Sequence, residues 1–217
     1  MESELLSKIK NIYYEYLYNN SIVFTFTDDY IIVLLKITNT QTNEYRTDII
    51  DLNNATYIGF NFIVLKIFNI WNPNISYSKK IIKYFDDSYL IFQENRIILK
   101  QDTNYIQNYD ILDKDIIMTD IYYIYFYKTI DTVFYKVLQQ YITNLNNFEG
   151  DCYEWYDNGM LYKKYNYKNG SRNGIWIKFY PSGVKTYNGK FINGNKVGNW
   201  IFYYETGEID TNKTRIY

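Results

Sequence analysis

The sequence predicts an α+β protein in two parts. A mixed domain of two helices and antiparallel strands spans residues 1–149, and an array of antiparallel β-hairpins spans residues 150–217. Three observations predict this division. Nine of the ten glycines lie at or after Gly150, and the segment that begins there repeats a pattern every 24 residues. The first part instead combines two apolar stripes at helical spacing with short β-branched and aromatic runs.

The first part opens with a predicted helix over residues 4–18, in which Leu5, Ile9 and Ile12 share one stripe and Ser3 is placed to cap the N-terminus. β-rich runs bounded by polar residues follow. The predicted strands are 21–27, 30–38, 57–68, 81–85, 89–93, 96–100 and 121–127. The expected turns and loop are Asp28-Asp29, Asp86-Asp87, Glu94-Asn95 and 102–115.

A second helix is predicted over residues 130–143. Its apolar residues follow the i, i+3, i+4, i+7 rule, as in Ile130, Val133, Phe134 and Val137. A strand with Val133 and Val137 on one face is the alternative. The first part is large enough to hold a core of its own, and we identify no family in it.

Each copy of the repeat carries the same landmarks. A glycine opens the copy, an aromatic pair precedes a second glycine, and Asn-Gly closes the first two copies. The copies are 150–173, 174–197 and 198–217. The second glycines are Gly159, Gly183 and Gly207, and the closing pairs are Asn169-Gly170 and Asn193-Gly194. A fixed period of this kind predicts small supersecondary units stacked on each other.

Within a copy the residues alternate at period two, with Ile175 and Ile177 pointing one way and Trp176 and Lys178 the other. The second glycine suits a left-handed turn position, and Asn-Gly suits a tight reversal. Each copy is therefore a predicted hairpin, and three hairpins make a meander of about six strands. Cys152 replaces tryptophan in copy one, and copy three lacks its final Asn-Gly, as capping copies would.

These residues resemble the MORN repeat, in the variant form found in bacterial proteins described as antitoxins. The resemblance is carried by 174–176, 179–183 and 190–198, and the further closely spaced glycines of the standard pattern are absent. The excess of Asn, Ile, Tyr and Lys is what A/T-rich codons produce, so the chain is also similar to MORN-repeat proteins of large amoeba-infecting DNA viruses. The resemblance implies a β-hairpin array used for protein–protein contact and, less directly, for contact with phospholipid headgroups.

Charge divides at the same boundary. Residues 1–149 carry 13 Lys+Arg against 18 Asp+Glu, a net charge of −5, whereas the array carries 10 against 6, a net charge of +4. The total of −1 predicts no strong attraction to nucleic acid. With Cys152 as the only cysteine and no apolar core of a signal peptide in MESELLSKIK, we expect an intracellular protein, in the host cytoplasm or virion if viral, and not a secreted one. The apolar stretches are strand-sized, so no transmembrane segment is expected.

The sequence offers little for catalysis. It has no histidine, the commonest general base and metal ligand. Cys152 stands at a tryptophan position of the repeat, which predicts a buried structural thiol. Asp28-Asp29 and Asp86-Asp87 lie between strands, where a turn is the preferred interpretation over a metal site. We therefore expect no catalytic, cofactor-binding or metal-binding residues and no enzyme activity.

The repeat sheet is the candidate interaction surface. Its tyrosines offer rigid contact area, and its lysines would steer an acidic partner. The candidate residues are Tyr156, Tyr180, Tyr204, Lys178, Lys185 and Lys190. If the first part covers that face, the tyrosines are core instead. Trp176 and Trp200 recur in register, which favours a structural role.

The function expected from the sequence is a non-enzymatic protein–protein interaction or scaffold protein with an unidentified protein partner. Two alternatives stay open. One is an antitoxin-like inhibitor of a specific protein, which a co-encoded toxic neighbour would favour. The other is an enzyme with its site in residues 1–149, which a carboxylate-lined pocket with convergent polar groups would favour.

Overall fold

The computed structural model describes residues 4–83, 88–93, 96–101, 123–142 and 147–217. Over these residues the chain is mixed α+β, with two α-helices and antiparallel strands arranged in three sheets. Ser3, the Asp86-Asp87 and Glu94-Asn95 turns and the 102–115 loop, which the sequence analysis singled out, lie outside the described residues.

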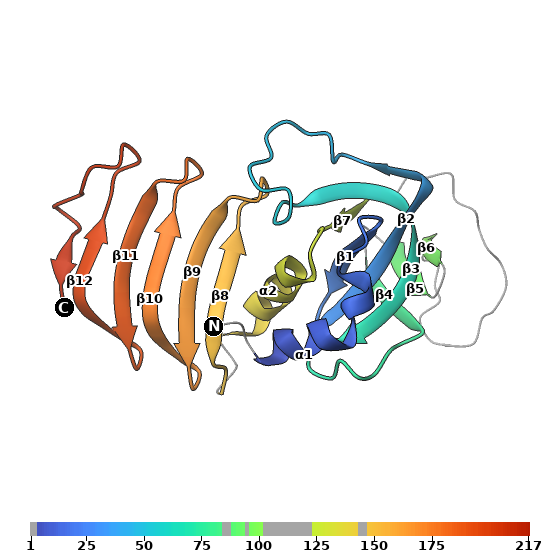
Figure 1. The fold of residues 1–217 in the computed structure, drawn as a ribbon, viewed down its shortest axis with the longest axis horizontal. Helices are drawn as coiled ribbons and strands as arrows, with labels where there is room; N and C mark the ends of the chain where they lie inside the picture. Colours follow the sequence, from blue (N-terminus) through green and yellow to red (C-terminus); the bar gives the residue numbers. More distant parts are fainter. Residues whose placement is uncertain (1–3, 84–87, 94–95, 102–122, 143–146) are drawn as a thin grey trace.

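The described residues of the first part form two sheets and two helices (Figure 1). The larger sheet has the strand order β1-β2-β3-β7, and the smaller one the order β4-β5-β6. Its helices are α1 (Glu4–Ile12) and α2 (Ile130–Tyr141), with a short 3₁₀ turn, η1 (Tyr14–Tyr16), after α1. Its strands are β1 (Ile22–Thr27), β2 (Tyr30–Thr42), β3 (Tyr57–Asn69), β4 (Lys79–Lys83), β5 (Ser88–Gln93), β6 (Arg96–Gln101) and β7 (Ile124–Phe126).

Period-two alternation in β2 gives the larger sheet a core on each face. Ile31 and Val33 are fully buried in the cluster that includes the helices. Ile32 and Leu34, one residue out of phase, are fully buried in the cluster that includes strands β5 and β6. The larger sheet is therefore the middle of three layers, because successive side chains of a strand point to opposite faces.

Helix α1 is shorter than the sequence predicts. The backbone leaves the α-helical pattern at Tyr13 and continues as η1, where the amide of Tyr16 donates to the carbonyl of Tyr13. The Tyr13 ring stacks on Phe68 and its hydroxyl donates to the carbonyl of Pro73 at 2.6 Å. A tertiary anchor at this residue therefore ends a helix that periodicity alone would extend.

Helix α2 confirms the predicted second helix, and the alternative strand is wrong. Thr129 caps its N-terminus, since the hydroxyl oxygen of Thr129 accepts from the amide of Thr132 at 3.3 Å. The apolar residues at helical spacing, Val133, Phe134 and Val137 among them, are fully buried. The strand expected over 121–127 is described only as the short β7.

The array is a six-stranded antiparallel sheet in chain order, β8 to β13, extending away from the first part (Figure 1). Its strands are β8 (Gly150–Trp155), β9 (Leu161–Lys168), β10 (Ser171–Phe179), β11 (Lys185–Ile192), β12 (Asn195–Phe202) and β13 (Arg215–Ile216). The predicted left-handed turns are confirmed, with φ of 85° at Gly159, 85° at Gly183 and 91° at Gly207. Both residues of each closing Asn-Gly also have positive φ, as a tight hairpin turn requires.

The first copy of the array is fixed to the first part. The turn at Asp157–Gly159 lies against the segment before β3, where the amides of Ile50 and Thr56 donate to the carbonyls of Asn158 and Asp157 at 2.8 and 3.0 Å. A Cβ at Gly159 would stand 2.1 Å from the carbonyl oxygen of Asp51, so only glycine fits there. Helix α2 packs on β8, and Gln139 donates to the carbonyl of Tyr153 at 3.1 Å.

Candidate interaction surface

The pairing register sorts the side chains of the array onto two faces. Residues paired across two strands point to the same face. Following the pairs from β8 to β13 therefore gives the face of each side chain. We call one the aromatic face, which carries Cys152, Tyr165, Tyr167, Trp176, Tyr187, Gly189, Phe191, Trp200 and Phe202. We call the other the aliphatic face, which carries Ile175, Ile177, Ile192, Val197, Ile201 and Ile216.

The aromatic face packs on itself. Trp176 and Trp200 are buried, and their indole N–H groups donate to the carbonyls of Asn166 and Lys190, each ten residues earlier, at 3.2 Å. Gly189 makes room for the second indole, because a Cβ there would stand 2.2 Å from a ring carbon of Trp200. The rings form the core of a thin sheet, as the sequence analysis predicted for the tryptophans.

The candidate tyrosines link one copy to the next. The hydroxyl of Tyr156 donates to the carbonyl of Phe179 at 2.8 Å, and that of Tyr180 donates to the carbonyl of Tyr203 at 3.0 Å. Burial raises the pKa of Tyr156 above its usual value. Tyr204, the third of the row, is 44% exposed. Two of the three tyrosines are thus held in place by inter-copy hydrogen bonds.

The candidate lysines are divided between the two faces. Lys178 shares the aromatic face, where its ammonium lies 5.0 Å from the Tyr162 ring centroid. The hydrogen bond to Tyr162 is the main cause that raises the pKa of Lys178. Lys185 pairs with Phe179 and Lys190 with Ile175, so both stand on the aliphatic face, exposed. The structure therefore does not bring the six candidate residues into one patch.

The aliphatic face exposes large apolar side chains. Ile175 is 61% exposed, Ile192 45% and Ile216 82%. Ile177, Val197 and Ile201 are half-buried beside them. The alternation of Ile175 with Trp176 was visible in the sequence, whereas the predicted binding residues were the tyrosines and lysines. The alternation itself carried the missed signal. A single-layer sheet that buries its rings on one face leaves the side chains of its other face exposed.

Cations stand over the rings of the aromatic face. The Lys163 ammonium lies 4.6 Å from the Tyr165 ring centroid and that of Lys196 lies 4.3 Å from Trp200. The Arg172 guanidinium lies 5.3 Å from Trp176 and 5.5 Å from Phe191. These distances fall within the range of cation–π attraction. The aromatic face therefore presents charge outward and rings inward.

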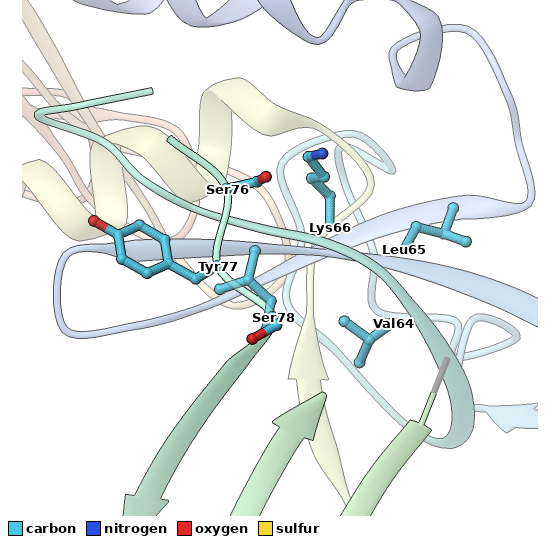
Figure 2. Close-up of a pocket in the computed structure, with 7 residues that line it drawn as sticks. Val64, Leu65, Lys66, Ser76, Tyr77 and Ser78 are labelled. Carbon is cyan, nitrogen blue, oxygen red and sulfur yellow. The ribbon is translucent and has the colours of Figure 1, made fainter. Parts of the chain in front are cut away.

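The described residues of the first part form a small hollow and a wider groove at the surface. A small one of about 200 Å³ lies between β3 and the segment 76–78, and Figure 2 shows the Lys66 and Tyr77 side chains pointing in different directions rather than into one site. A wide, open groove of about 770 Å³ lies between α1 and the residues just before β8. Glu4, Lys8 and Glu149 line it.

Glu44 is the centre of an ion-pair cluster in the first part. Glu44 bonds both Lys128 and Lys36, at 2.9 and 3.1 Å, and so ties β2 to the segment before α2. Although burial alone would raise it, these bonds hold the pKa of Glu44 below its usual value. No group of three or more Cys, Asp or Glu side chains able to hold a metal occurs among the described residues.

Cys152 is the buried thiol that its repeat position predicts. It is 1% exposed, and burial is the main cause that raises the pKa of its thiol far above the usual range. A thiol held in its neutral form is a poor nucleophile. In the part of the chain that the structure describes, no helix is long and apolar enough to cross a membrane.

Comparison with known proteins identifies no relative of this chain, so the function is inferred from the array itself. No protein-family model matches the chain, and no curated protein and no solved structure matches it. The likeness to MORN repeats thus stays a resemblance of residues 150–217.

Proposed function

We propose that this chain is a non-enzymatic interaction protein whose MORN-like array receives another protein on its aliphatic face. The observation that carries the proposal is the exposure of Ile175, Ile192 and Ile216 on one face of a single sheet. Exposed apolar side chains on one face are typical of protein contact sites. Burial of apolar surface in a complex contributes about 25 cal/mol of favourable free energy per Å². We also propose that the chain acts inside the cell.

The rigid attachment of the first copy supports it. The inter-copy bonds of Tyr156 and Tyr180 and the docked turn at Gly159 hold the sheet in one shape. A surface that is ordered before contact loses little conformational entropy when a partner binds. Lys164 and Lys190 stand on the aliphatic face and would steer an acidic partner toward it.

The test is affinity purification from the native host, read by mass spectrometry, with the full chain as bait. The double variant Ile175→Asp with Ile192→Asp should lose a partner that the unchanged chain retains. Ile75→Asp, at a residue 46% exposed in the first part, is the matched control and should retain it. The partner must then bind the purified chain directly. A partner kept by the double variant, or lost equally by the control, would refute the assignment to this face.

A further inference from the structure

We propose a second, separate binding site: the aromatic face holds an extended acidic segment of a protein, rich in Asp and Glu, across its strands. The site does not depend on the aliphatic face. Five cationic side chains from four strands carry it, and the register places all of them on the aromatic face. They are Lys163, Arg172, Lys178, Lys196 and Arg215.

The positive charge of this face is largely uncompensated. Glu154 lies on the same face and its carboxylate is 3.5 Å from the Lys163 ammonium. Among the described residues, no salt bridge joins a carboxylate to Arg172, Lys178, Lys196 or Arg215. Arg172 and Arg215 are exposed. Along the paired strands of this face, five cations stand against the one carboxylate of Glu154, on a chain whose total charge is −1.

The rings below hold the cations in place. Lys163, Arg172 and Lys196 each lie over two rings, the second ring of Lys196 being that of Tyr217 at 4.9 Å. A long cationic side chain in solution loses rotamer freedom when it pairs with a carboxylate. Here the rings of the aromatic face already restrict the side-chain rotamers of three of the five cations. An anionic partner therefore meets a row of ordered charges.

The dimensions suit an extended peptide. The row runs from β9 to β13, four strand spacings or about 19 Å. An extended chain advances about 3.3 Å per residue, so about six residues cover that distance. Acidic side chains on such a segment would meet cations on β9, β10, β12 and β13 in turn.

The same geometry disfavours other polyanions. Proteins that bind single-stranded nucleic acid stack its bases on open aromatic rings. On this face Trp176 and Trp200 are 6% and 3% exposed, beneath the cations. Peripheral membrane contact draws on apolar side chains inserted among the lipids, and the exposed isoleucines stand on the opposite face.

The experiment titrates the full chain with a deca-glutamate peptide and follows tryptophan fluorescence, because Arg172 and Lys196 touch two of the four tryptophans. Saturable binding is expected, weakening as NaCl is raised from 20 to about 200 mM because exposed charge pairs are screened. Arg172→Glu with Lys196→Glu should weaken the affinity at least tenfold. Arg172→Gln with Lys196→Gln, which adds no repulsion, should weaken it severalfold.

Lys79→Glu with Lys168→Glu is the matched control, with the same change of charge at two exposed lysines away from the aromatic face. It should bind within twofold of the unchanged chain. Equal loss in the two charge reversals would show a net-charge effect and overturn the site. Absence of saturable peptide binding would overturn it as well. Tighter binding of a 20-nucleotide oligo-dT or of vesicles with 30% phosphatidylserine at the same salt would overturn the acidic-peptide assignment.

Discussion

Gly189→Ala should destabilise the array through one contact. Gly189 does not have positive φ, so alanine suits its backbone. The new Cβ would stand 2.2 Å from Cδ2 and 2.3 Å from Cε2 of Trp200. Carbon contacts need about 3.5 Å, so the indole has to move by about 1.3 Å. Overpacking of this kind costs about 1–3 kcal/mol, and the movement strains the Trp200 hydrogen bond to Lys190 as well.

The assay is urea and thermal unfolding followed by circular dichroism. A loss of about 2 kcal/mol corresponds to a fall in Tm of about 4–8 °C for a chain of this size. Trp200→Leu removes the obstructing ring, so Gly189→Ala should cost little in that background. Unchanged stability in the single variant, or strictly additive effects in the double variant, would refute the packing argument.

Three further predictions use other contacts. Tyr180→Phe removes the hydroxyl that bonds the carbonyl of Tyr203 and should cost about 1 kcal/mol in urea unfolding, whereas Tyr45→Phe, 85% exposed, should cost nothing measurable. Gly183→Val should lower Tm, since a β-branched residue is strained at φ of 85° and Met160 lies 3.0 Å from the new Cβ; an unchanged Tm would count against the turn. Burial, with Tyr16 beside it, raises the pKa of Tyr13 to about 12, so its contribution to stability is complete below pH 10 and is lost as the pH rises from 10 toward 12. Tyr13→Phe should therefore flatten the loss of stability measured between pH 9 and 11.5, and an unaltered slope would contradict it.

Repetition made the array the predictable portion of the fold. Gly159, Gly183 and Gly207 recur at one spacing because one turn geometry recurs, so the hairpins could be derived from local chemistry. Helix α1 shows the opposite case. Its end at Ile12 depends on the contact of Tyr13 with Pro73, sixty residues away, which no local pattern reports.

The faces of the array were predictable, but their roles were not. Period-two alternation assigns Trp176 and Ile175 to opposite faces, and the pairing of β10 with β11 confirms that assignment. Whether a tyrosine hydroxyl is open or bonded depends on the distance to the next copy, as for Tyr156 and the carbonyl of Phe179. The docking of the Gly159 turn on Asp51 joins segments about a hundred residues apart, so it too required the fold.

The hydrogen bonds of Tyr156 and Tyr180 have a consequence for array length. Each joins a copy to the backbone of the next one, at a carbonyl 23 residues on, and so asks only that another copy follow. The turn of the first copy, by contrast, packs against the backbone of Asp51, and only one copy can occupy that place. A further copy of residues 174–197 inserted before Gly198 would satisfy the same bond and lengthen the sheet by two strands, about 10 Å. The array can therefore be extended away from the first part, which stays fixed at one end. The number of copies sets the length of both faces.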